Sequence, residues 1–152
     1  FKVINTMMHE SAHAFVALLL NAEVIQIELL SDTSGTALTK TASKWKRFLI
    51  SFAGYPLATA IAWILFYVAL KQWYVPGLIG LLIIILLNLT FFVRNMYGIF
   101  WLITYGLIIA IVLYLKNPLL TSIVLYITAG IILIESIISI IQLLVIAWKQ
   151  PN

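Results

Sequence analysis

The segment at residues 3–20, VINTMMHESAHAFVALLL, decides how the rest of the chain is organised, because it places a polar motif inside an apolar run. Its central residues, His9-Glu10-Ser11-Ala12-His13, contain the only two histidines of the chain. In a helix these histidines lie one turn apart on one face, with Glu10 on the same side. This is the H-E-x-x-H pattern, in which two imidazoles bind Zn²⁺ and the glutamate is the general base. The alternative is a pair of histidines that only satisfy hydrogen bonds on a helix.

The composition predicts an integral membrane protein. Of 152 residues, 64% are hydrophobic and 9% are charged, and the mean hydropathy is +1.12. A soluble domain has about 45–50% apolar and about 25% charged residues. The net charge of +4 comes from cations that flank apolar runs, and no basic stripe interleaved with aromatic residues indicates a nucleic-acid partner. Cysteine is absent, which excludes disulfides and thiolate metal sites.

The order of apolar and polar segments predicts an all-α polytopic membrane protein with about five transmembrane helices and a small β-hairpin inserted after the first. The hairpin follows from partial alternation around a Gly-containing turn, in which we interpret Asp32 as a turn-former. Because the chain opens at Phe1 without a methionine, we expect sequence to be missing before it. We predict one membrane-embedded domain over residues 1–152, with the H-E-x-x-H helix at 1–21, the hairpin at 22–42, and transmembrane helices at 46–70, 76–93, 96–115 and 119–148.

The polar residues of the first helix need a polar environment. Placing charged groups in a membrane helix costs several kcal/mol unless they face a cavity, a partner or a metal. A catalytic zinc site normally has three protein ligands, so the two histidines require one more. Glu135 is the one carboxylate in the second half of the chain, near the middle of the last predicted helix. It belongs to a polar stripe at seven-residue steps, with Thr121, Thr128 and Gln142. Glu135 is therefore either the third zinc ligand or a protonated carboxyl that bonds a neighbouring helix.

Asn95 is a second candidate site residue, seven positions after Asn88 on a polar helix face. Its amide can bond a ligand, position the substrate backbone or cap a helix end. We favour substrate binding or support of the metal site over direct coordination.

The charges of the loops predict the orientation in the cell membrane. With five alternating crossings, the hairpin side collects more cations than the opposite side. The cations on the hairpin side are Lys40, Lys44, Lys46, Arg47, Arg94 and Lys149, and those on the other side are Lys2, Lys71 and Lys116. The positive-inside rule then places the hairpin and the C-terminus in the cytoplasm.

With these residues in view, the chain resembles the site-2-protease class of intramembrane metalloproteases, the M50 peptidases, and most closely their M50B-like bacterial branch. The resemblance rests on the His9–His13 motif and on three further stretches: Asp32-Thr33-Ser34-Gly35, Ala53-Gly54-Tyr55-Pro56, and Phe92-Val93-Arg94-Asn95-Met96-Tyr97-Gly98. It implies that His9 and His13 bind zinc, that Glu10 is the general base, and that the hairpin presents an extended substrate. Family members often take their third ligand from an aspartate, whereas this chain has no aspartate after position 32. Glu135 is assigned to that role by elimination.

Together these features predict a zinc-dependent intramembrane endopeptidase. Its substrate would be a membrane protein, cleaved in or near a transmembrane segment that unwinds and pairs with the hairpin. Two alternatives remain: a catalytically silent relative that binds membrane proteins, and a small transporter or channel subunit that uses Glu135. The second alternative has no need of an H-E-x-x-H motif.

Overall fold

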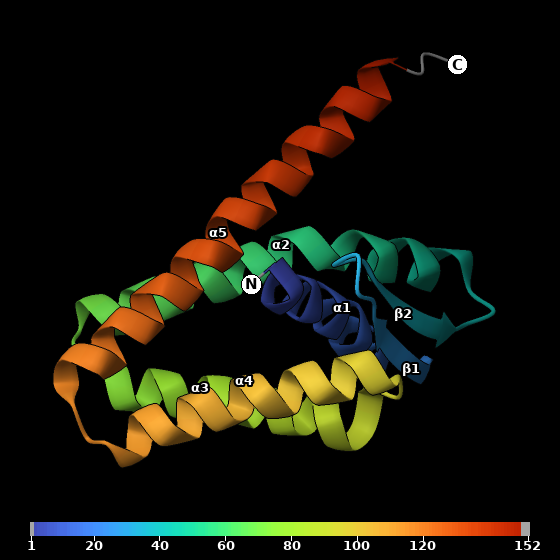
Figure 1. Cartoon of the computed structure of the whole chain (residues 1–152). Helices are drawn as coiled ribbons and strands as arrows, with labels where there is room; N and C mark the ends of the chain where they lie inside the picture. Colours follow the sequence, from blue (N-terminus) through green and yellow to red (C-terminus); the bar gives the residue numbers. More distant parts are fainter. Residues whose placement is uncertain (1, 150–152) are drawn as a thin grey trace.

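A computed structural model describes residues 2–149 as five long helices and a two-stranded hairpin (Figure 1). This confirms the predicted fold class. The elements in chain order are α1 (Lys2–Leu19), β1 (Glu23–Leu29), β2 (Gly35–Lys40), α2 (Lys44–Leu70), α3 (Tyr74–Leu87), the π-helical turn η1 (Asn88–Phe92), α4 (Met96–Tyr114) and α5 (Pro118–Lys149).

Four segments in this part of the chain are long and apolar enough to cross a membrane: Lys44–Leu70, Tyr74–Phe92, Met96–Tyr114 and Pro118–Gln142. The helix α1 is not one of the four, because its polar residues lower its hydropathy. It packs instead against α2, α5 and both strands. The motif helix therefore contacts both the helical bundle and the hairpin.

Buried alanines lie on both α1 and α2, which pack on each other. Ala14 and Ala17 on α1 are fully buried, as is Ala62 on α2, while Ala58 is almost so. Alanine and glycine at a helix interface let the two backbones approach closely. The packing of α1 on α2 places the motif next to Ile50 and Gly54 of α2.

The hairpin is antiparallel, with Leu29 paired to Gly35 next to the turn and a bulge near Val24. The side chains of Ile27 and Leu29 are fully buried, so one face of β1 belongs to the core. A two-stranded hairpin is marginal alone in water, and this one is stabilised by packing on the helical bundle.

The segment that follows η1 closes the outer edge of β1. Val93 pairs with Ile27 in a single parallel bridge, and the Arg94 amide donates to the Ile27 carbonyl at 3.3 Å. Within residues 2–149, β2 pairs only with β1. The hairpin therefore has one closed edge, along β1, and one open edge, along β2.

Thr121 and Thr128 of the polar stripe, and Ser136 next to Glu135, are buried against the bundle. The Thr128 hydroxyl is hydrogen-bonded to the Tyr105 hydroxyl at 2.6 Å, and Ser136 Oγ donates to Asn5 Oδ1 at 3.1 Å. The second half of α5 extends away from the other helices (Figure 1). Gln142, at the end of the stripe, is exposed.

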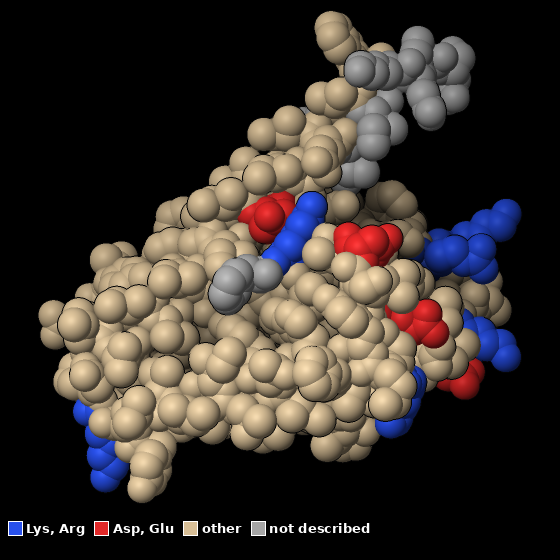
Figure 2. All heavy atoms as spheres, in the orientation of Figure 1, with Lys and Arg blue, Asp and Glu red and all other residues tan. Residues whose placement is uncertain are grey.

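The surface carries few charges. In Figure 2 most of the visible face is uncharged, and charged side chains gather at the end that holds the hairpin and the start of α2. Because Val93 pairs with Ile27, the turn between α3 and α4 lies at this same end.

Candidate metal centre

The two histidines of α1 converge on one point. His9 Nε2 lies 3.0 Å from His13 Nε2, and the rings are almost perpendicular, at 87°. Nitrogen ligands of a tetrahedral Zn²⁺, each about 2.0–2.1 Å from the metal, are about 3.3 Å apart. The spacing of the two nitrogen atoms is thus close to the one that a shared zinc ion requires.

A backbone carbonyl orients His13. Its Nδ1 lies 2.6 Å from the carbonyl oxygen of Ile50, on α2. Because a carbonyl only accepts, Nδ1 carries the proton and Nε2 presents its lone pair toward His9. Histidines that bind metals are commonly held in this way, by a carbonyl or carboxylate on the other ring nitrogen.

Gly54 of α2 provides the space that the two imidazoles occupy. A Cβ atom at this position would overlap the His9 ring and would lie 2.6 Å from His13 Nε2. The neighbouring Tyr55 ring packs on His9, with the ring centroids 4.2 Å apart. Gly54 is a site residue that its own residue type does not indicate. The sequence feature that points to it is its place in the Ala53-Gly54-Tyr55-Pro56 stretch.

Glu10 lies under the start of β2. Its side chain is only 7% exposed, and a Cβ on Gly35 would lie 2.9 Å from Glu10 Cγ and 3.3 Å from Oε1. The hydroxyl of Thr6 donates to the Thr33 carbonyl at 2.7 Å, which fastens the hairpin turn to α1. The open strand of the hairpin therefore begins beside the glutamate of the motif.

A polar cavity of about 430 Å³ joins α1, the hairpin turn, α2 and α5. His9, Glu10 and Asp32 line it together with Ser139 and Gln142 of α5. The Ser34 hydroxyl and amide donate to Asp32 Oδ1, at 2.6 and 3.0 Å, and these bonds hold the pKa of the Asp32 carboxyl below its usual range. The polar lining suits water, and the cavity reaches both a histidine and the glutamate.

The model of the Peptidase M50B-like family matches residues 1–152, the whole chain. The chain belongs to this family. No curated protein matches it, and neither does any solved structure. Membership supports a metallopeptidase at the level of the family, and the four apolar spans of this M50B-like chain make it a membrane protein.

Glu135 is not grouped with the histidines. Among residues 2–149, no three His, Cys, Asp or Glu side chains lie where they could hold a metal together. Glu135 Oε2 lies 3.7 Å from Lys2 Nζ. This oxygen is buried and has no hydrogen-bond partner in the described part of the chain. A buried acceptor without a partner commonly marks the place of a water or an ion. Within residues 2–149, however, this carboxylate does not join the imidazoles in one donor set, so His9 and His13 form the candidate metal-binding pair of this M50B-like chain.

Asn95 binds the hairpin. Its Oδ1 accepts from the Leu29 amide at 3.0 Å, and its Nδ2 donates to the Leu29 carbonyl. The side chain thus pairs with β1 as a neighbouring strand would, and it continues the pairing that Val93 begins. Asn95 is not among the residues that line the polar cavity.

Proposed function

We propose that this M50B-like protein is a zinc-dependent intramembrane endopeptidase that cleaves a membrane protein in or near a transmembrane segment. The observation that carries the proposal is the convergence of His9 Nε2 and His13 Nε2, with Glu10 beside them in a polar cavity of an apolar bundle. Polar groups in such a bundle are costly to keep unless they serve a function.

His9 and His13 would hold the metal. Glu135 stays the proposed third ligand, although in this structure it lies beside Lys2 and is not grouped with the histidines. When bound, zinc supplies a Lewis acid that polarises the peptide carbonyl and lowers the pKa of water. Glu10 takes the proton of the attacking water and passes it to the leaving amine. The Ile50 carbonyl keeps the proton of His13 on Nδ1, away from the metal.

The substrate would lie along β2. The edge of β1 is occupied by Val93 and Asn95, which leaves the edge of Gly35–Lys40 for strand pairing. A transmembrane helix shields its own peptide bonds, so it must unwind before cleavage. Main-chain hydrogen bonds to β2 offset part of that cost, and Gly35 places the start of this edge next to Glu10.

The substitution Glu10→Gln tests the proposal. Purified wild-type protein should contain about one zinc per chain and cleave members of a panel of single-span substrates in liposomes. The variant should retain zinc and lose cleavage, because an amide cannot accept the proton. Glu23→Gln is the matched control, since Glu23 is exposed at the start of β1, and it should cleave normally.

Three outcomes would contradict the proposal. Wild-type protein that is folded but contains no zinc would rule out the proposed zinc site. Zinc-loaded protein that binds the substrates without cleaving them would indicate a silent relative. Ion or proton flux through liposomes that survives chelation would favour a transporter that uses Glu135.

A further inference from the structure

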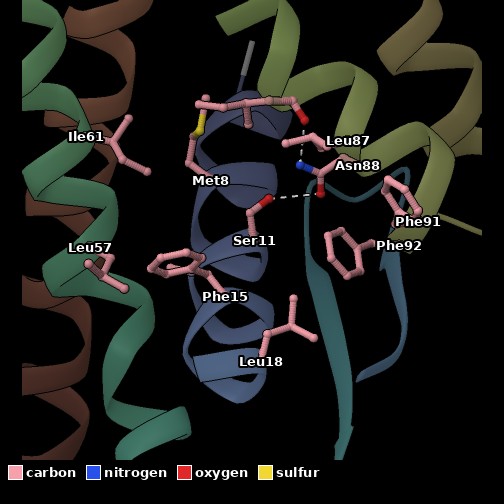
Figure 3. Close-up of a pocket in the computed structure, with 12 residues that line it drawn as sticks. Met8, Ser11, Phe15, Leu18, Leu57, Ile61, Leu87, Asn88, Phe91 and Phe92 are labelled. Atoms are coloured by element: carbon pink, nitrogen blue, oxygen red, sulfur yellow. Dashed lines mark hydrogen bonds between the residues drawn. The ribbon is translucent and has the colours of Figure 1, made fainter. Parts of the chain in front are cut away.

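A second cavity lies behind the motif helix, on the face of α1 turned away from the histidines. It has a volume of about 620 Å³ and is bounded by α1, α2, α3 and η1 (Figure 3). Ser11 and Phe15 line it from α1, Leu57 from α2 and Phe91 from η1. At 3.6 residues per turn, Ser11 and Phe15 lie about half a turn around the helix from His9 and His13. The cavity is therefore separate from the polar cavity of the metal centre.

The floor of this apolar cavity is closed and its polar groups already have partners. Met8 and Ala12 are buried. Ser11 Oγ donates to Asn88 Oδ1 at 2.9 Å, and Asn88 Nδ2 donates to the Ile84 carbonyl at 2.9 Å. None of the described residues that line the cavity is charged. A ligand in this cavity thus needs no charge and no hydrogen-bonding group.

The rim of the apolar cavity opens sideways between two membrane spans. Phe15, Leu18, Leu87 and Phe91 are all exposed large apolar residues that line it. Its walls belong to the candidate spans Lys44–Leu70 and Tyr74–Phe92. An opening between two spans faces the hydrocarbon of the bilayer, where the molecules at hand are lipid chains and transmembrane helices.

The volume of the cavity distinguishes these two occupants. One turn of an α-helix, with a diameter of about 10–12 Å and a pitch of about 5.4 Å, fills roughly 400–600 Å³. A spanning helix has about 20 residues, or more than five turns. A cavity of about 620 Å³ therefore holds little more than one turn. A single acyl chain is thinner, flexible and wholly apolar, which agrees with the lining.

We propose that this apolar cavity is a binding site for one acyl chain of a membrane phospholipid. The bound chain packs against Met8 and Ala12, on the back of the helix that carries His9 and Glu10. Because a ligand that binds only the folded state stabilises it by mass action, the lipid holds the motif helix in place. This site is independent of the metal centre and of the proposed catalysis.

Photolabelling in liposomes tests the site. The probe is a phosphatidylcholine with a diazirine on one acyl chain, in vesicles of phosphatidylcholine, and adducts are mapped on the full chain. We expect labelling of Phe15, Leu57 and Phe91 several-fold above that of Phe100, which is exposed on α4 outside the cavity.

A matched pair of tryptophan variants on α3 separates the cavity from the general lipid surface. Leu87 lies on the rim, whereas Ile83, one turn away and similarly exposed, does not line the cavity. Leu87→Trp fills the cavity and should reduce labelling of Phe15 and Leu57 several-fold. Ile83→Trp should leave it unchanged. Added phosphatidylcholine should raise the Tm of the delipidated wild type and of Ile83→Trp, and should raise that of Leu87→Trp less.

Equal labelling of Phe15 and Phe100 would overturn the proposal, since it would show only the lipid that surrounds any membrane protein. Adducts that join Phe15 to a second polypeptide would assign the cavity to a helix instead. If Leu87→Trp does not fold, Leu57→Trp fills the same cavity from α2, and unchanged labelling of Phe15 and Phe91 in that variant would also overturn it.

Discussion

Because Gly54 has no side chain, it leaves the space in which the imidazoles of His9 and His13 approach each other. We predict that Gly54→Ala lowers zinc affinity about 10–100-fold, the range seen when the surroundings of metal ligands are disturbed. The reason is that the added Cβ occupies the place of the His9 ring. Zinc titration of the purified variant measures the loss.

Gly80→Ala is the control for this substitution. Gly80 is also a helical glycine, on α3, and a Cβ there has no described neighbour within 4 Å. Alanine favours a helix over glycine by about 1 kcal/mol, so this variant should keep its zinc affinity with an unchanged or slightly higher Tm. Equal zinc affinity in the Gly54 and Gly80 variants would show that Gly54 does not shape the site.

Glu135 offers a second test at the level of single residues. We predict that Glu135→Gln lowers zinc affinity, because the amide loses the charge of the proposed third ligand, whose buried Oε2 has no hydrogen-bond partner among the described residues. Zinc content after dialysis measures the effect, with the exposed Glu23→Gln as control. Unchanged zinc content would show that Glu135 is not the third ligand. Asp32 and Gln142, which line the same cavity as His9, would then be the candidates.

At the scale of elements, the contact between Asn95 and Leu29 holds the hairpin in position. We predict that Asn95→Ala increases hydrogen exchange over residues 23–40 and raises KM more than it lowers kcat, with zinc content unchanged. Each lost hydrogen bond is worth about 0.5–1.5 kcal/mol, and the open strand that would bind substrate is paired to the one that Asn95 fixes.

Two further variants show whether Asn95 acts through β1. Asn95→Asp keeps an acceptor for the Leu29 amide and should restore part of the protection from exchange. Met96→Ala changes the next residue, which is 81% exposed, and should behave as the wild type. If Asn95→Ala instead lowers kcat while hydrogen exchange stays normal, Asn95 contacts the substrate or the reacting groups directly.

For the whole molecule, the four crossings of α2 to α5 predict the orientation without the help of α1. Because the chain has no cysteine, single cysteines report each side of the membrane cleanly. We expect an impermeant maleimide to label Leu115→Cys in intact cells, and to label Ser31→Cys and Met96→Cys only after permeabilisation. The reason is that the positive-inside rule predicts a cytoplasmic side for the cations of the hairpin and for Arg94. Labelling of Ser31→Cys in intact cells would show that the hairpin lies outside the cell, which is the opposite of the predicted orientation.

The sequence by itself determined the local features of this protein. The four-residue spacing of His9 and His13 already places both imidazoles on one helix face, and apolar runs already predict membrane helices. The hairpin could also be predicted from the sequence, because its turn residues and the alternation in its strands involve only a few neighbouring positions. These properties depend on neighbours in the chain, so they can be derived without a fold.

Only the tertiary structure decided which distant groups complete those features. The Ile50 carbonyl that orients His13 is 37 residues away, and Asn95 meets Leu29 across 66 residues. The pairing of Lys2 with Glu135, the space at Gly54 and the acyl-sized cavity behind α1 likewise depend on how the helices pack. Helix packing is set by many weak contacts summed over whole faces, and residue spacing does not encode which side chain or carbonyl ends up opposite another.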